Sequence, residues 1–374
     1  MNETVSSSVV ASFVGGVVLA LALQALYGPI CQIMVVPQEV QSLLRTYTVL
    51  RCVGLPMFGA ANALEGAFLG RKDALTTMYV WLVAGAITAG LQFFFITPGT
   101  GATSAMLMAG LALTVGQAYS FAHFSFIAHK RGFFSLRSVL RNRTEGLASA
   151  AARLIGRLQR ENIISEVAWL VLNASARMTT YMVLTTCATQ LGVVAAAVNK
   201  TLLDLYILLG LCAEPVFTVG NVLLPRKIRD PTDVATYRRA LFYIALFMGF
   251  TLAVLAYVAC GSTWLFDDPR ALDAAKSLRG VVAVTIGLST ASYATDGCVI
   301  GTGDAKFVGT AQMVNVSFFI GIFIAFQTLY GAATSLHHLW SALLAFQALR
   351  LAEHAWKLIV DERALASRPA SVPA

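Results

Sequence analysis

Long stretches without any Asp, Glu, Lys or Arg constrain the fold of this chain more than any other feature. The stretch from Ala74 to His129 is far longer than the roughly 20 apolar residues that one helix needs to cross a membrane. It therefore predicts two spans, with a turn at Thr97-Pro98-Gly99-Thr100-Gly101. Similar stretches run from Thr4 to Gln38, from Met178 to Asn199, from Ala240 to Phe266 and from Phe307 to Leu349.

Composition and segment length together predict an all-α membrane protein with about ten transmembrane helices. Only 12% of the residues are charged and 57% are hydrophobic, whereas a soluble domain carries about 25% charged residues. Unpaired backbone amides are costly in lipid, and these runs are too continuous for the short alternating strands of a barrel. The expected helices cover residues 9–36, 46–70, 74–97, 103–129, 164–190, 193–225, 237–264, 278–301, 305–329 and 336–358.

The net charge of +8 does not indicate a nucleic-acid partner, because the basic residues are confined to short gaps between apolar stretches. Most of them lie in gaps that should share one side of the membrane: at Arg71, between Lys130 and Arg160, between Arg226 and Arg239, at Lys306 and from Lys357 onward. The positive-inside rule places these gaps and both chain ends on the cytoplasm-equivalent side.

A polar segment at residues 130–163 divides the chain into two expected lobes of unequal size. Residues 1–129 hold four predicted helices, residues 164–360 hold six, and residues 361–374 form a polar tail. Within the segment, apolar residues recur at helical spacing opposite arginines, which predicts an amphipathic helix on the membrane surface. That helix either tethers the two lobes or recognises a particular lipid.

An internal repeat links the two lobes. Residues 65–74 and residues 296–305 both read acid-Gly-x-x-x-Gly-x-x-Asp-Ala at the end of a predicted span, which predicts a shared helix-turn-helix unit. Transporters use such duplications to place substrate between two lobes that rock. The glycine pairs Gly66/Gly70 and Gly297/Gly301 are of the kind that lets helices approach closely, so we expect close packing at both.

The repeat and two further segments resemble the MATE (multidrug and toxin extrusion) family, in particular its plant plastid branch related to the salicylate-pathway exporter. The further segments are Leu211-Cys212-Ala213-Glu214-Pro215 with Gly220-Asn221, and Leu339-Trp340-Ser341-Ala342-Leu343 with Phe346-Gln347. The resemblance implies two lobes of six helices and export of organic solutes by proton or sodium antiport. Counterparts of the first two helices are missing, which indicates either an incomplete gene product or a degenerate first lobe.

Ionisable residues inside predicted spans are the candidate functional residues, because each costs at least about 2.5 kcal/mol in the membrane. Glu214 lies in an apolar helix directly before Pro215, and hydrocarbon favours the neutral form of a carboxylate. It is either the proton-coupling residue or a carboxylate that is hydrogen-bonded to a neighbouring helix. Lys200 and Asp204 lie one helical turn apart and should pair, as a buried structural ion pair or as part of the coupling site.

Four other residues complete the candidate set. Glu166 should be a helix-entry carboxylate. Arg177, with Asn173 one turn before it, could attract an organic anion or pair with an acid from another span. Asp296 and its repeat counterpart Glu65 are expected close to the membrane interface, where they pack or extend towards water; Arg51 and Arg350 are also expected there.

We therefore expect a monomeric secondary active transporter that exchanges a small organic solute or anion for H⁺ or Na⁺ and has membrane lipids as its other partners. It should need no cofactor beyond the coupling ion. A lipid flippase of the same superfamily and an inactive truncated transporter are the alternatives. Motifs of membrane enzymes are absent from the sequence, so an enzyme is not expected. Plasma membrane, vacuole and plastid envelope all remain open as locations.

Overall fold

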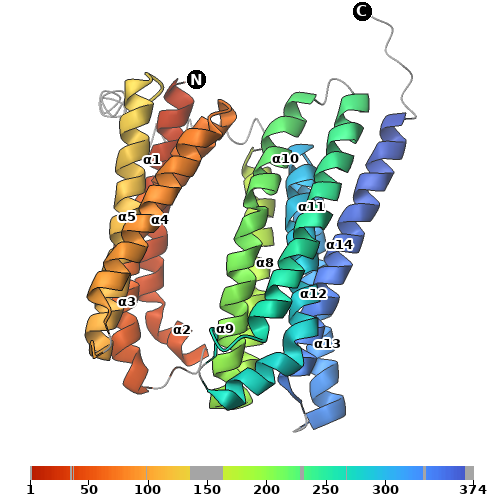
Figure 1. The fold of residues 1–374 in the computed structure, drawn as a ribbon. Helices are drawn as coiled ribbons and strands as arrows, with labels where there is room; N and C mark the ends of the chain where they lie inside the picture. The colour runs from red at the N-terminus through yellow and green to blue at the C-terminus, as the bar shows by residue number, and fades with distance from the viewer. Residues whose placement is uncertain are drawn as a thin grey trace, which may run out of the picture. The chain divides into compact units, whose positions relative to one another are not determined.

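The protein was analysed as a computed structural model, which describes residues 2–33, 36, 38–97, 99–134, 163–227, 231–266, 268–331 and 334–366. Contacts between Cα atoms divide the chain into two units, Met1–Leu158 and Gln159–Ala374 (Figure 1). All regular structure in the described residues is helical. The predicted amphipathic helix of residues 130–163 lies almost entirely outside the described residues, as does the end of the predicted tail, from residue 367 onward.

The first unit is a small bundle built around one long helix. Its helices are α1 (Asn2–Ala25), α2 (Tyr27–Ile33), α3 (Gln38–Gly70), α4 (Ala74–Phe95) and α5 (Ala102–Lys130). Helix α3 packs against both α1 and α5. The single helix predicted for residues 9–36 is wrong, because the chain breaks after Ala25. Pro29 explains the break, since its ring clashes with the carbonyl group four residues earlier and it has no N–H.

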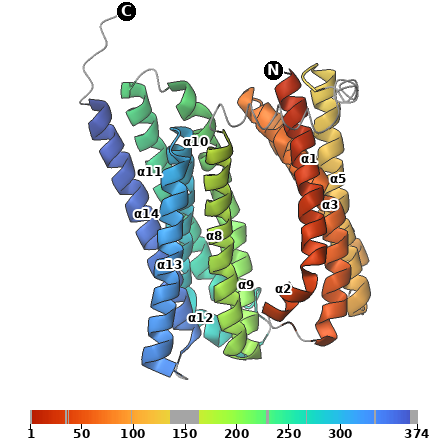
Figure 2. The same ribbon diagram turned by 180° about the vertical axis from the view of Figure 1, so that it is seen from behind.

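The second unit surrounds one central helix, as the views from both sides show (Figures 1 and 2). Its elements are α8 (Ile163–Gln190), α9 (Val193–Gly210), the 3₁₀ turn η2 (Leu211–Ala213), α10 (Glu214–Lys227), α11 (Pro231–Cys260), α12 (Pro269–Gly301), α13 (Ala305–Tyr330) and α14 (Leu336–Ala366). Helix α12 packs against α9, α10, α11 and α14. Its second half is almost fully buried and includes Ser, Thr and Asp side chains.

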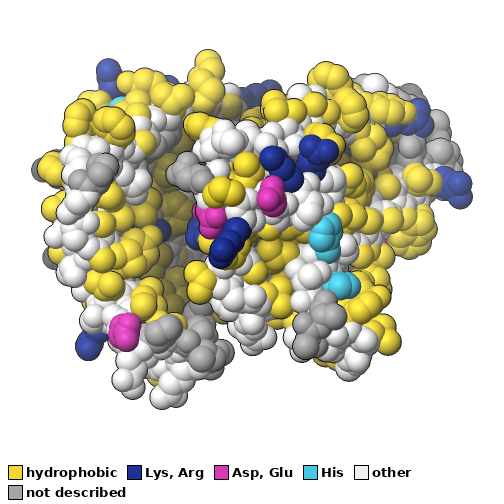
Figure 3. Space-filling model, turned by 60° about the horizontal axis from the view of Figure 1, so that its bottom comes forward, with side chains coloured by type: hydrophobic (Ala, Val, Ile, Leu, Met, Phe, Trp, Pro, Cys, Tyr) yellow, Lys and Arg dark blue, Asp and Glu magenta, His cyan; other side chains and the backbone are white. Residues whose placement is uncertain are grey.

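The apolar surface of the helices is that of a multi-pass membrane protein. Seven segments of the described chain are long and apolar enough to cross a membrane, and they correspond to α1, α3, α4, α5, α9 with α10, α11 and α13. The other three long helices, α8, α12 and α14, match the remaining predicted spans but are less apolar. Hydrophobic side chains cover much of the face shown in Figure 3, and charged side chains are few there.

The two copies of the sequence repeat have the same local structure. Helix α3 ends at Gly70 and α12 at Gly301, and after a short turn an aspartate caps the next helix in both units. Asp73 accepts a hydrogen bond from the Thr76 N–H at 3.1 Å, and Asp304 accepts one from the Phe307 N–H at 3.2 Å. The residue before each aspartate has a positive φ: 66° at Lys72 and 88° at Gly303. The predicted helix-turn-helix unit is therefore confirmed in both copies.

In each unit, a basic residue near the end of the helix after the helix-turn-helix repeat also contacts the capping aspartate. These helices are α5 in the first unit and α14 in the second. Arg131, which follows α5, forms an ion pair with Asp73. Lys357 of α14 lies 2.6 Å from Asp304. Burial would raise the pKa of Asp73, but hydrogen bonds from Thr76 and Arg131 outweigh it and hold the pKa below its usual value. The structural equivalence thus extends beyond the ten residues of the sequence pattern.

The two glycine pairs of the repeat differ in their surroundings. A Cβ atom on Gly297 would lie 2.2 Å from the Phe217 carbonyl oxygen, and one on Gly301 would lie 2.4 Å from the Gly220 carbonyl oxygen. Helix α10 therefore crosses α12 in backbone contact, as predicted. A Cβ atom on Gly66 or Gly70 would meet nothing within 4 Å in the described structure. The prediction of close packing is correct for the second pair and wrong for the first, because no described helix crosses α3 at that point.

Candidate functional site

Glu214 lies where a membrane-spanning segment is interrupted. The predicted continuous helix of residues 193–225 is divided into α9 and α10 by the 3₁₀ turn, and Glu214 is the first residue of α10. Pro215 accounts for the interruption, because its ring is incompatible with a regular carbonyl position at Leu211, where the turn begins. The Glu214 side chain is exposed on the surface of the second unit. The break thus presents a carboxylate within the length of a span.

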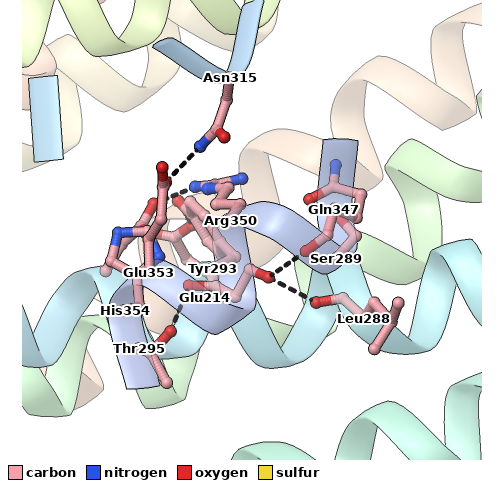
Figure 4. Close-up of polar contacts among 12 residues, drawn as sticks. Glu214, Leu288, Ser289, Tyr293, Thr295, Asn315, Gln347, Arg350, Glu353 and His354 are labelled. Carbon is pink, nitrogen blue, oxygen red and sulfur yellow. Dashed lines mark hydrogen bonds and ion pairs between the residues drawn. The ribbon is translucent and has the colours of Figure 1, made fainter. Parts of the chain in front are cut away.

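Tyr293 of α12 holds this carboxylate in place. Its hydroxyl group donates a hydrogen bond to Glu214 Oε2 at 2.5 Å (Figure 4). The Tyr293 ring stacks on Phe217 of α10, with ring centroids 4.8 Å apart and planes at 7°. The hydrogen bond to a neighbouring helix is one of the two alternatives that the sequence left open for Glu214. Sequence analysis did not single out Tyr293, because only the fold brings it next to α10.

Arg177 of α8 approaches the same tyrosine, and Asn173 precedes Arg177 by one helical turn. The Arg177 guanidinium carbon lies 5.2 Å from the Tyr293 ring centroid, within the range of a cation–π contact. Among the described residues Arg177 forms no ion pair, and its buried Nε atom has no hydrogen-bond partner. Asn173 is buried, and its Oδ1 atom likewise has no partner among those residues. Two candidates therefore contact one tyrosine: Glu214 accepts a hydrogen bond from its hydroxyl group, and Arg177 lies near its ring.

Asp296 lies one helical turn beyond Tyr293 and is sealed inside the second unit. The carboxylate is 1% exposed and forms an ion pair with Arg350 of α14, which is also 1% exposed. Of the two alternatives for Asp296, packing and extension towards water, the structure shows packing, because α12 and α14 enclose the carboxylate. Arg350, which was also expected near the membrane interface, is buried in the same pair. Arg51, by contrast, is half-buried, and its Nη1 atom has no hydrogen-bond partner among the described residues.

His354 extends the buried cluster along α14. Its Nε2 atom lies 3.1 Å from Asp296 Oδ1. The contact is not aligned as a hydrogen bond, since Oδ1 and both ring nitrogens have no such partner in the described structure. Beside the cluster, Asn315 of α13 donates a hydrogen bond to Glu353 at 2.7 Å (Figure 4). The cluster thus joins α12, α13 and α14.

A second buried network lies on the other side of Arg350. The Gln347 side-chain amide donates to the Tyr206 hydroxyl group at 2.6 Å, and that hydroxyl group lies 2.7 Å from Ser289 Oγ. Sequence reasoning missed both networks. One pattern in the sequence could have indicated them: polar residues recur at helical spacing on one face of α14, at Gln347, Arg350, His354, Lys357 and Asp361. Asp361 lies beyond the predicted end of this helix at residue 358.

The remaining candidates lie apart from these networks. Lys200 and Asp204 form the expected ion pair on α9, but their side chains are 64% and 59% exposed, so the pair is not buried. The opposite face of α9, with Val198, Leu202 and Tyr206, is the one that packs into the core. Glu166 is exposed in the first turn of α8, as a helix-entry carboxylate should be.

Comparisons with known proteins give a consistent set of relatives. No family model matches the chain. The chain is 24% identical to DETOXIFICATION 45, a chloroplastic protein of Arabidopsis thaliana, over 93% of its own length and 59% of that protein. It is 25% identical to DETOXIFICATION 44, also chloroplastic and from the same plant, over 95% of its own length and 65% of that protein.

Solved structures show the same fold. A eukaryotic MATE transporter matches 97% of this chain and 81% of its own, with a TM-score of 0.76 and 13% identity. A MATE transporter of Vibrio cholerae matches 96% of this chain and 78% of its own, with a TM-score of 0.71 and 14% identity. The chain therefore has the MATE fold.

This fold and the long apolar helices are those of a multi-pass integral membrane protein. The chain spans only about three fifths of the length of the curated relatives that it matches. The helix interrupted at Glu214 and the buried Asp296–Arg350 pair both lie in its second unit. Glu214 is exposed, whereas Asp296 is buried with a fixed cation as its partner.

Proposed function

We propose that this chain is a member of the MATE family and a secondary active transporter, which exports a small organic solute in exchange for protons or sodium ions. Export would follow an alternating-access cycle, in which coupling-ion binding shifts the balance between two conformations. The observation that carries the proposal is the exposed carboxylate of Glu214 at the interruption of a membrane-spanning helix. Irregular backbone at membrane depth is tolerated where it lines protein or water-filled space, and discontinuous helices of transporters hold ion and substrate sites.

The groups around Glu214 support an ion-coupling role. The Tyr293 hydrogen bond at 2.5 Å orients the carboxylate, and the Phe217 ring fixes the tyrosine. Arg177 reaches the same ring from α8, so protonation of Glu214 would change the charge balance beside a guanidinium group that forms no ion pair with the described residues. We assign Arg177 and Asn173 to the binding of an anionic or polar part of the solute. The exposed Lys200–Asp204 pair on α9 is the second candidate for coupling.

We also propose a plastid membrane as its location. Both curated relatives are named as chloroplastic proteins, and the similarity to each covers more than nine tenths of this chain. Expression of the full chain with a C-terminal fluorescent protein in plant cells tests this. A signal confined to the plasma membrane or the vacuole would contradict it.

Transport in proteoliposomes tests the coupling proposal. The purified chain would be reconstituted, and the movement of ethidium, an organic cation, and fluorescein, an organic anion, would be followed with and without imposed pH and sodium gradients. We expect gradient-driven movement of at least one dye, and its loss in Glu214→Gln. Glu39→Gln is the matched control, since Glu39 is also an exposed glutamate in the first turn of a helix.

Two results would contradict the proposal. Dye movement that is equal with and without either gradient would exclude coupling. Full gradient-driven transport by Glu214→Gln would exclude Glu214 as the coupling residue. Vesicles with a fluorescent phospholipid address the flippase alternative, because a flippase would move the lipid and neither dye. Tyr293→Phe keeps the stacked ring and removes the hydrogen bond, so it should lower coupled transport while the protein stays folded.

A further inference from the structure

A narrow groove lies between α11 and α14. It has a volume of about 120 Å³ and is lined by Arg238, Arg239, Phe242, Tyr243, Leu358 and Ile359, among others. These residues lie in the first turns of α11 and the last turns of α14, so the groove opens at one end of the spans. By the positive-inside rule this is the cytoplasm-equivalent end. Pockets for drug-sized solutes measure about 300–1,000 Å³, so this groove suits a smaller group.

Arg238 gives the groove its unusual chemistry. The side chain is 6% exposed, and its only ion pair in the described structure is a long one, 3.4 Å from Nη2 to Asp361 Oδ2. Its Nε and Nη1 atoms have no hydrogen-bond partner among the described residues. Asp361 also binds Lys357 at 2.9 Å, and Lys357 in turn contacts Asp304. A buried guanidinium group with one long ion pair and few hydrogen bonds has a high desolvation cost, which a nearby anion would lower.

The surroundings of the groove match the headgroup level of a membrane. Tyr237, Tyr243 and Trp356 are 40%, 67% and 60% exposed on the same ends of α11 and α14. Tyrosine and tryptophan are enriched at membrane–water interfaces, where one end of the ring is apolar and the other is wet. Beyond the arginines the walls are apolar, and Ile359 is 50% exposed. The groove therefore offers cations at headgroup level and an apolar surface below them.

We propose that this groove binds one anionic phospholipid, with its phosphate at Arg238 and Arg239 and its acyl chains along Phe242, Leu358 and Ile359. Arginine binds phosphate oxygens with paired N–H donors, and basic pockets between transmembrane helices bind anionic headgroups. The apolar walls favour a lipid over free phosphate, because phosphate alone would leave them without a partner. The bound lipid bridges α11 and α14, and this role does not depend on the transport proposal.

Native mass spectrometry of the detergent-purified full chain tests the inference. The chain would first be equilibrated with equal amounts of phosphatidylglycerol and phosphatidylcholine and then stripped by increasing detergent. We expect one phosphatidylglycerol to be retained in preference to phosphatidylcholine, and Arg238→Gln to weaken that retention about fivefold. Arg270→Gln is the matched control, because Arg270 is exposed at the start of α12, outside the groove. It should leave retention unchanged.

A second variant keeps the test decisive if Arg238→Gln is poorly folded. In Leu358→Trp, the larger side chain would occupy the space along the apolar wall of the groove, while both arginines remain. This variant should also release the lipid. Equal retention of the two lipids by the wild type would overturn the proposal. So would retention in Leu358→Trp equal to that of the wild type. Displacement of the lipid by millimolar inorganic phosphate, with unchanged phosphate binding in Leu358→Trp, would show a free-phosphate site and would also overturn it.

Discussion

The ion pair of Asp296 and Arg350 is fully buried in the second unit. Both side chains are 1% exposed, and the pair lies inside a unit whose outer surface is apolar. Moving an ion out of water costs several kcal/mol, and only its partner and nearby hydrogen bonds compensate for that cost. His354 adds a third polar group at 3.1 Å without completing a hydrogen bond. Each of the two buried charges is therefore stabilised mainly by the other.

Removal of one partner should destabilise the protein much more than removal of both. Arg350→Met leaves the Asp296 carboxylate buried without its cation, and we expect a loss of about 3–5 kcal/mol. In the double variant Asp296→Asn with Arg350→Met, much of that loss should be recovered. Thermal unfolding in detergent measures both, with the exposed Lys306→Met as control. Equal destabilisation in the single and double variants would show that the two charges do not depend on each other.

At the level of single residues, sequence reasoning worked where the decisive neighbours are close along the chain. Lys200 and Asp204 are four positions apart and pair as expected. Pro215 follows Glu214 directly and marks the interruption, although residues 193–225 were predicted as one continuous helix. Asp296 and Arg350 are 54 positions apart, and only the packing of α12 on α14 brings them together. Tyr293 was missed for the same reason.

The positions where helices begin and end depend on glycine, aspartate and proline residues. Predicted and observed limits agree well where Gly331, Asp73 or Asp304 marks an end. They disagree at Pro29, which breaks a stretch that is apolar on both sides, and at α3, which begins eight positions before its predicted start at 46. Polar residues such as Gln38 and Glu39 were assigned to a loop, whereas a helix can carry them beyond the hydrocarbon.

The glycine pairs of α12 and α3 provide a matched comparison of helix packing. Gly297→Ala places a Cβ atom 2.2 Å from the Phe217 carbonyl oxygen, so backbone must move, and we expect about 1–3 kcal/mol of destabilisation. Gly66→Ala meets no atom of the described residues within 4 Å and should be neutral or stabilising by up to about 1 kcal/mol. Thermal unfolding of the two variants checks this. A similar loss in both would mean that α3 is covered at Gly66.

On the scale of the whole molecule, the distribution of charge determines the predicted topology. Helix α4 contains 22 residues, which corresponds to about 33 Å and is enough to cross the hydrocarbon core. The Lys72 turn and the Thr97 turn at its two ends must then face opposite sides. The positive-inside rule places Lys72 on the cytoplasm-equivalent side, together with Lys306 of the second unit.

Labelling of single cysteines in sealed vesicles tests this topology. In a Cys212→Ser background, which removes the exposed native cysteine, Lys72→Cys and Lys306→Cys should react with an impermeant maleimide from the same side. Thr97→Cys should react only from the opposite side. Reaction of Lys72→Cys and Lys306→Cys from different sides would contradict the predicted arrangement.

The repeat has a consequence for how the two units can change. In α12, any side chain at position 297 or 301 would strike the backbone of α10, so selection for folding acts on every substitution there. In α3, a Cβ atom at position 66 would meet none of the described residues within 4 Å. Sequence drift should therefore replace Gly66 long before Gly297 or Gly301, while the capping aspartates would keep the two copies recognisable.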